Sequence, residues 1–164
     1  EREENIPCDL NNTEWFAKID ASNGAVFFAS GVFYYFLTEQ VKALVQSMAN
    51  AFPGGVLVFD VNTAAKLAAL DGQVFLDETE DTYCVWRTEY HRGLCTYYMD
   101  LFRRRGDGAW RRSAEVHRQR AYSVEELTAW LAAAGFGDVR VYGDMRMRRP
   151  RVDEQRVYIS CVRK

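Results

Sequence analysis

The two histidines are the side chains best suited to proton transfer, because the pKa of an imidazole lies near neutrality. His91 lies in a predicted turn, where an exposed histidine is the usual case. His117 alternates with Glu115 and Gln119 on one face of a predicted strand, which could be a polar wall of a substrate pocket or simply a solvated side. Neither histidine has a cysteine or a second histidine at ligand spacing, so the sequence predicts no metal site.

An aromatic stretch at 34–36, Tyr-Tyr-Phe, offers a different chemistry. Tyr34 and Tyr35 follow directly on a predicted strand, and aromatic faces attract cations. These rings could therefore line a pocket for a substrate or a cationic ligand. Packing into the core explains them equally well.

A strand, a helix and a second strand must position these residues. Residues 25–33 (AVFFASGVF) form an apolar run that is typical of a strand covered on both faces. Apolar side chains recur at helical spacing over 38–52, with Thr38 as the expected N-cap. Residues 56–61 (VLVFDV) form a second buried strand. A crossover helix of this length predicts that the two strands are parallel.

The second strand ends at polar residues. Asp60, Asn62 and Thr63 lie at its carboxyl end, which is where open α/β sheets bind their ligands. They could therefore face a substrate. An N-cap role in a following helix explains Asn62 or Thr63 equally well.

The middle of the chain predicts an antiparallel meander of three strands. Its strands cover 83–90, 94–102 and 109–122, and turns at 91–93 and 105–108 separate them. The meander occupies 82–122 as an insertion in a single domain, 1–164.

A helix and two strands complete the predicted fold. Ser123 and Glu126 form a capping box for a helix over 123–136, and Gly135 is its C′ glycine. Strands follow at 138–144 and 155–163, and we expect them to pair antiparallel. The fold class is therefore α/β, with an antiparallel end to the sheet.

Composition and charge exclude several classes of protein. A net charge of −2 gives no overall field that would steer the chain to nucleic acid or to a membrane. The four cysteines are far apart, which argues against a zinc site or a disulfide framework and fits a reducing cytosol. No apolar run approaches the roughly 20 residues of a membrane span. The first residues, EREENIPCDL, are unlike a signal peptide, so we expect a cytoplasmic protein.

Two arginine-rich stretches, 103–112 and 146–151, are the most basic parts of the chain. Trp110 lies among the arginines of the first stretch, and such a combination can bind nucleic acid by phosphate contact and stacking. A solvated hairpin tip is the preferred explanation at this small net charge. We therefore do not expect a nucleic-acid partner.

Three stretches together resemble class I S-adenosylmethionine-dependent methyltransferases. Residues 8–15 (CDLNNTEW), with the strand–helix–strand unit, are similar to the middle of the family, and the polyketide and leucine-carboxyl O-methyltransferase branch has a similar sequence there. Residues 115–144 look like the segment that leads into the family's sixth strand, and 156–164 (RVYISCVRK) look like its last strand. The resemblance implies S-adenosylmethionine as cofactor and methyl transfer to an oxygen or nitrogen of a small molecule.

The resemblance also implies a cofactor site. Asp9 matches the acidic residue that takes the adenine amino group, and the backbone N–H of Leu10 would contact the ring. Ala29, Ser30 and Gly31 match the end of the family's fourth strand, beneath the methionine part of the cofactor. The alternatives are a turn cap for Asp9 and close helix packing for the three small residues.

One family feature is missing from these residues. The family begins with a strand and a loop of the form Gly-x-Gly-x-Gly, where glycine lets the backbone approach the cofactor. No such pattern precedes residues 25–33. The resemblance then implies a partial Rossmann-like sheet that contains the family's strands four, five, seven and six, in sheet order, with helices on its faces. We expect the chain alone to be a truncated and inactive portion of such an enzyme, and we name no catalytic residue, since in-line displacement needs mainly proximity and orientation.

Loss of the first strand has a physical consequence. The family's fourth strand pairs with its first, so residues 26–33 would become an exposed apolar edge, which favours pairing with another chain. We expect a homo-oligomer that forms through this edge. The alternative function is therefore a non-enzymatic dimerisation or partner-binding module derived from the methyltransferase fold.

Overall fold

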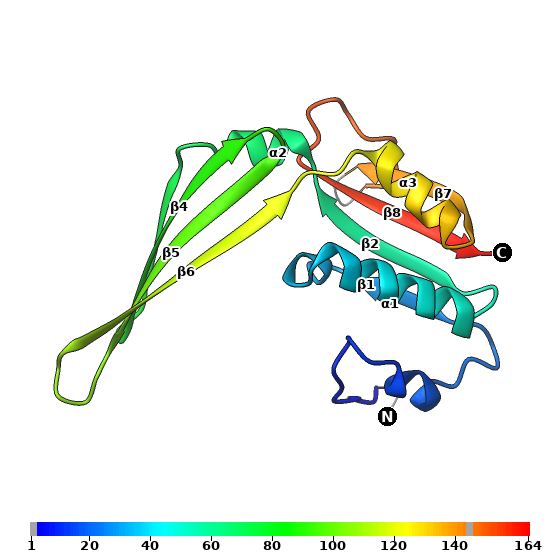
Figure 1. Ribbon diagram of the computed structural model, residues 1–164, viewed down its shortest axis with the longest axis horizontal. Coiled ribbons are helices and arrows are strands. Elements are labelled where there is room, and N and C mark those ends of the chain that lie inside the picture. The colour runs from blue at the N-terminus through cyan, green and yellow to red at the C-terminus, as the bar shows by residue number, and fades with distance from the viewer. Residues whose placement is uncertain (1–2, 144–145) are drawn as a thin grey trace. The chain divides into compact units, whose positions relative to one another are not determined.

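The computed structural model describes residues 3–143 and 146–164, which form two compact units (Figure 1). The first unit contains the chain up to Val61, Val124–Arg151 and Arg156–Lys164. The second contains Asn62–Ser123 and Val152–Gln155. The predicted insertion, 82–122, lies wholly inside the second unit, and each unit has a sheet of its own.

The sheet of the first unit has four strands in the order β1-β2-β8-β7. These are β1 (Val26–Ala29), β2 (Val56–Asn62), β8 (Arg156–Arg163) and β7 (Phe136–Gly143). β1 and β2 are parallel, and β7 and β8 are antiparallel. Backbone hydrogen bonds join the start of β2 to the end of β8, so these two strands are antiparallel as well. The predicted strand order four, five, seven, six is therefore confirmed.

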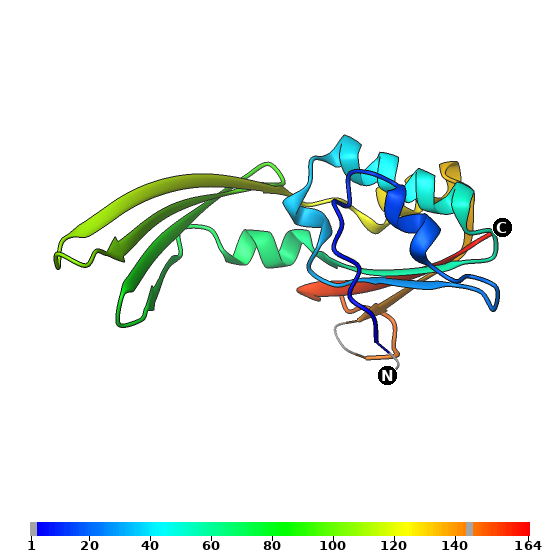
Figure 2. The same ribbon diagram turned by 90° about the horizontal axis from the view of Figure 1, so that it is seen from below.

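Two helices cover one face of this sheet, α1 (Thr38–Ala51) and α3 (Val124–Ala133) (Figure 2). Their apolar sides, together with the short 3-10 helix η1 (Glu14–Lys18), enclose the core of the unit. This face of β2 and β8 is fully covered: Leu57 is 1% exposed and Ile159 0%. The core consists of Trp15, Val45, Met48, Ala49, Leu57, Phe59, Leu131, Phe136, Ile159 and Cys161.

The first predicted strand is shorter than expected and is covered on one face only. β1 ends at Ala29, Gly31 turns the chain with a φ of +62°, and Phe33–Tyr35 form the 3-10 helix η2. Val26 and Phe28 remain 71% and 65% exposed, because α1 and α3 pack on the opposite face. The prediction of a strand over 25–33 with two covered faces was therefore wrong.

The helix ends agree only in part with the predicted caps. Leu37, not Thr38, is the N-cap of α1, and its backbone N–H donates to the Gln40 side chain at 2.8 Å. Gly135 follows α3 with a φ of +85°, as a C′ glycine requires. The capping box of Ser123 and Glu126 stays a prediction.

The second unit is an antiparallel sheet in the order β3-β4-β5-β6 with one short helix. The three predicted strands are present as β4 (Thr82–His91), β5 (Leu94–Arg104) and β6 (Trp110–Arg120). The sequence analysis missed β3 (Val74–Glu78) and α2 (Ala64–Ala69), which have only five and six residues.

The predicted strand at 138–144 is β7 of the first unit; residue 144 lies outside the described part. Across the described ranges, no helix is both long and apolar enough to span a bilayer.

Candidate functional site

The carboxyl ends of β1 and β2 are tied together by a buried carboxylate. Asp60 Oδ1 accepts the backbone N–H of Gly31 at 2.5 Å, and Arg156 Nη1 lies 3.4 Å from Asp60 Oδ2. The Asp60 side chain is only 6% exposed. A buried carboxylate needs such partners, since burial without them is costly. The pair fixes the turn after β1, where a ligand of an open α/β sheet is expected.

Two tyrosines stand on this edge. The Tyr34 and Tyr35 rings lie 4.2 Å apart, and the Tyr34 hydroxyl donates to Tyr35 at 3.0 Å. This hydrogen bond raises the pKa of Tyr34, because it stabilises the neutral phenol, and partial burial and Asp60 act in the same direction. The rings are 54% and 73% exposed, so they are not core residues. The neighbouring Phe33 is the ring that packs inward, against Phe59.

The small residues of this edge differ in exposure. Ala29 ends β1 and packs against the core, while Ser30 is exposed in the turn that leads to Gly31. A Cβ on Gly31 would meet only Tyr34 Cε1, at 3.8 Å, so its positive φ rather than crowding favours glycine. Close packing of a helix therefore does not explain the glycine at position 31. Exposed phenols and one buried carboxylate give this edge a character that suits a cationic ligand.

Asp9 and Leu10 lie in the first unit but have structural contacts. Asp9 Oδ1 accepts hydrogen bonds from the backbone and the side chain of Asn11, both at 2.9 Å. This is the turn cap that the sequence allowed as an alternative. Leu10 packs against the hydrophobic core of the unit. Their adenine-binding role stays a prediction.

A second group of predicted residues lies on the sheet of the second unit. Gln119 Oε1 accepts from the Tyr97 hydroxyl at 2.9 Å and lies 3.5 Å from Asn62 Nδ2. His117 Nε2 lies 2.9 Å from Glu115 Oε2, on the same face of β6. The fold thus brings Asn62 and Tyr97 to Gln119, while His117 has its contact with Glu115.

Thr63 and His91 stand apart from that group. Thr63 caps α2 by accepting the N–H of Lys66 at 3.2 Å and donates to the Glu154 carbonyl at 2.5 Å. The helix-cap explanation is therefore the observed one for Thr63. His91 is exposed at the end of β4, beside a tight turn in which Arg92 and Gly93 have φ of 48° and 83°. The described residues contain no group of three or more possible metal ligands.

Sequence analysis did not single out Arg156 or Gln119 as members of a site. Arg156 reaches Asp60 only because β8 lies beside β2. Gln119 meets Tyr97 only through the pairing of β5 with β6. Residues brought together by strand pairing have no signature in the local sequence.

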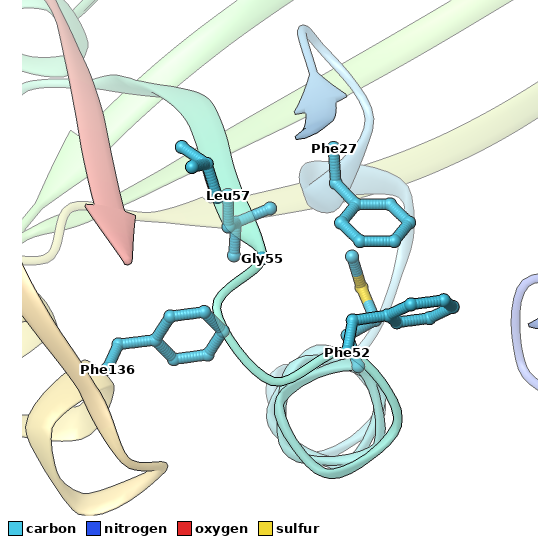
Figure 3. A pocket seen from close by; sticks show the side chains of 7 residues that line it. Phe27, Phe52, Gly55, Leu57 and Phe136 are labelled. Carbon is cyan, nitrogen blue, oxygen red and sulfur yellow. The ribbon is translucent and has the colours of Figure 1, made fainter. Parts of the chain in front are cut away.

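A small apolar pocket lies between α1 and the sheet (Figure 3). Phe27, Phe52 and Phe136 point into it, and its free space is about that of one water molecule. It has no polar side chain to orient a ligand. The pocket therefore belongs to the core and not to the candidate site. Its lining is Phe27, Met48, Phe52, Gly55, Val56, Leu57 and Phe136.

Comparisons of the sequence with known proteins find relatives that are named as methyltransferases. No family profile matches the chain. The chain is 30% identical over 112 residues to "Putative methyltransferase YqeM" of Bacillus subtilis (strain 168), covering 66% of this chain and 45% of that protein. It is 28% identical over 108 residues to "Putative methyltransferase GWCH70_2453" of Geobacillus sp. (strain WCH70), covering 63% and 43%. The matched region thus spans less than half the length of either relative.

Solved structures share the fold. A S-adenosylmethionine-dependent methyltransferase from Clostridium acetobutylicum ATCC 824 matches with a TM-score of 0.70 at 20% identity, over 96% of this chain and 63% of that one. The S-adenosylmethionine-bound amino pentose methyltransferase CalS10 from Micromonospora echinaspora matches with a TM-score of 0.61 at 20% identity, over 96% and 63%. The sugar N-methyltransferase KedS8 from Streptoalloteichus sp. ATCC 53650 matches with a TM-score of 0.61 at 23% identity, over 96% and 61%.

Proposed function

The chain has the fold of the class I S-adenosylmethionine-dependent methyltransferases, and we propose that it takes part in methyl transfer from this cofactor to an oxygen or nitrogen of a small molecule. The observation that carries the proposal is the edge formed by Gly31, Tyr34 and Asp60 at the carboxyl ends of β1 and β2. Its position follows the general rule for ligands of open α/β sheets. The curated relatives named as methyltransferases support the same function.

Each residue of the edge has a proposed part in binding. Ala29, Ser30 and Gly31 form the floor beneath the methionine part of the cofactor, and Asp60 holds that floor through the Gly31 N–H. Tyr34 and Tyr35 present their exposed rings to the positive sulfonium. The residue types therefore fit the methionine half of the cofactor.

The cofactor supplies the activated methyl group, and the protein contributes mainly orientation. Within the second unit, His117 is held by Glu115 and can accept a proton from a hydroxyl or ammonium acceptor. Asn62 contributes hydrogen bonding to the same acceptor. These roles extend the proposal to the residues that the sequence singled out for substrate.

The 164 residues contain no Gly-x-Gly-x-Gly loop. In the family, the backbone of this loop lies close to the cofactor. We therefore propose that this chain alone binds the cofactor weakly and does not catalyse methyl transfer. We also propose that polypeptide outside these 164 residues supplies the loop. The four free thiols support our proposal that the protein is located in the reducing cytoplasm. Titration with S-adenosylhomocysteine, followed at the Gly31 amide, tests the cofactor assignment.

A second candidate function rests on a different observation. β1 is the edge strand of its sheet, and Val26 and Phe28 are exposed on it. Exposed apolar edges favour pairing with another chain. We propose as the alternative a dimerisation or partner-binding module that uses this edge.

A further inference from the structure

We propose that β6 (Trp110–Arg120) docks an extended peptide with acidic side chains, which adds to the sheet of the second unit as a further strand. β6 is an edge strand, because the strand order is β3-β4-β5-β6 and β6 lies beside β5 alone (Figure 1). Alternate residues of an edge strand point their backbone N–H and C=O groups away from the sheet. Within residues 3–143 and 146–164, no backbone hydrogen bond reaches these outward groups of β6. An added strand would satisfy them.

β6 is long, and it is exposed along almost its whole length. It has 11 residues, against five in β3, the other edge strand of this sheet. Every side chain of β6 except Gln119 is exposed. Soluble proteins usually keep edge strands short or covered, since a long exposed edge pairs readily with another chain. The length of β6 therefore gives a partner strand room for a full ladder of hydrogen bonds.

The charge of β6 selects an acidic partner. Four of its side chains are positive and one is negative, namely Arg111, Arg112, Arg118, Arg120 and Glu115. Arg112 Nη2 lies 2.7 Å from Asp100 Oδ1, whereas Arg111 and Arg118 form no ion pair with any residue that the structure describes. Arg111 also lies directly opposite Arg103, and like charges in this position are destabilising. A carboxylate on an added strand would pair with Arg111 from the other side.

One side of β6 also has an apolar centre. Residues alternate between the two sides of a strand, so Ala114 and Val116 lie on the same side as Arg112 and Arg118. Val116 is 54% exposed. Arginines alone would suffice to protect an edge from pairing, and an exposed valine between them does not serve that purpose. We therefore expect apolar residues of the partner opposite Ala114 and Val116, because side chains directly opposite each other contact across a sheet.

A second copy of β6 fits this edge poorly. Antiparallel pairing centred on Glu115 would place Arg112 opposite Arg118, and a shift by one position would place Arg111 opposite Arg118 or Arg120. Each of these registers brings like charges together. Nucleic acid would pair with the arginines but would leave the backbone groups of the edge unsatisfied. An acidic peptide meets both needs.

β3 of a second copy is a weaker candidate for the partner. It ends in Asp77 and Glu78, but its five residues cannot span Arg111 and Arg118, which are seven positions apart. A separate peptide is therefore the better match. Its binding needs neither the cofactor nor methyl transfer, so the inference stands apart from the proposed function.

The test is a fluorescence anisotropy titration of the full chain against a labelled peptide, Glu-Thr-Val-Lys-Val-Thr-Glu-Glu, designed to pair antiparallel with residues 111–118. We expect saturable binding that is at least about tenfold tighter than that of the charge-reversed peptide Lys-Thr-Val-Glu-Val-Thr-Lys-Lys. A peptide with proline in place of both valines keeps the charge but cannot complete the ladder, and it should not bind. Equal binding of the acidic peptide and either control, or no saturable binding at all, would overturn the proposal.

Two matched variants locate the binding. Arg118→Glu should weaken the acidic peptide about tenfold, and a peptide that begins with lysine instead of glutamate should bind this variant better than the wild type. Arg140→Glu makes the same charge change on β7, an edge strand of the first unit, and should leave the affinity unchanged. In ¹⁵N spectra, amides of β6 should shift and those of β3 should not. Equal weakening in the two variants, shifts outside β6 only, or tighter binding of a single-stranded oligonucleotide than of the acidic peptide would each contradict the assignment.

Discussion

The Asp60 carboxylate accepts the backbone N–H of Gly31 at 2.5 Å and so joins two strand ends that are 29 residues apart in sequence. Its second oxygen lies 3.4 Å from Arg156, at the start of β8. One buried side chain thus fixes three chain segments at the edge where we propose the cofactor.

Replacement of Asp60 by alanine should destabilise the protein. The change leaves the Gly31 N–H without its acceptor, and loss of a partner of this kind costs about 1–3 kcal/mol. Urea unfolding measures the change in the free energy of unfolding. Glu39→Gln is the control, because its exposed ion pair with Lys42 contributes at most about 1 kcal/mol. Equal stability of the two variants would show that Asp60 does not hold the edge.

Arg163 should be sensitive even to lysine. Its guanidinium donates to the carbonyls of Ala49 and Gly135, each at 2.8 Å, and so satisfies the ends of α1 and α3. Lysine keeps the charge but cannot reproduce the fork, and we expect a loss of about 1–3 kcal/mol by thermal or urea unfolding. Arg118→Lys, on the exposed side of β6, should change stability by less than about 0.5 kcal/mol. A tolerated Arg163→Lys would mean that the helix ends find other donors.

Cys161 should make stability fall at high pH. Burial raises the pKa of its thiol from the ordinary 9.0 to about 11. Between these values the unfolded chain binds fewer protons than the folded one, so the free energy of unfolding decreases as pH rises. The fall reaches roughly 2–3 kcal/mol over this range. The fall should be unchanged in Cys8→Ala and smaller in Cys161→Ala, where only the raised pKa values of Cys84 and Cys95 still contribute among the thiols. The same slope in both variants would refute the cause.

Self-association should depend on the exposed face of β1. Phe28 is 65% exposed, and a lysine there adds charge to an apolar edge strand, which is a common protection against pairing. We expect the wild-type chain to sediment as a dimer or larger species at micromolar concentration and Phe28→Lys to sediment as a monomer. Leu94→Lys, on the sheet of the second unit, is the control. A monomeric wild type would remove the alternative function.

The fold could largely be predicted from the sequence because its main elements have strong local signals. The apolar run at 56–61, the helical spacing over 38–52 and the glycine at 135 each appear where expected. β3 and α2 were not predicted because they are short and their side chains are mostly exposed. The extent of β1 was overestimated because an apolar run does not reveal that one face has no covering helix.

The candidate site was predictable only where a residue stands at a strand end. Gly31 and Asp60 were found in this way, and the structure adds that they touch. Arg156 and the group around Gln119 depend on which strands pair and in which register, which no short stretch of sequence specifies. The assignment of the cofactor residues remains a prediction.

The most direct test of the central claim is a titration of the ¹⁵N-labelled chain with S-adenosylhomocysteine, followed at the Gly31 amide. We predict a saturable shift of this signal with a Kd of about 1 mM, equivalent to about −4 kcal/mol, because the chain contributes only part of the site. The shift should be lost in Asp60→Ala and kept in Glu39→Gln. A Gly31 amide that does not move at saturating ligand, while the chain remains folded, would contradict the claim that the carboxyl ends of β1 and β2 bind the cofactor.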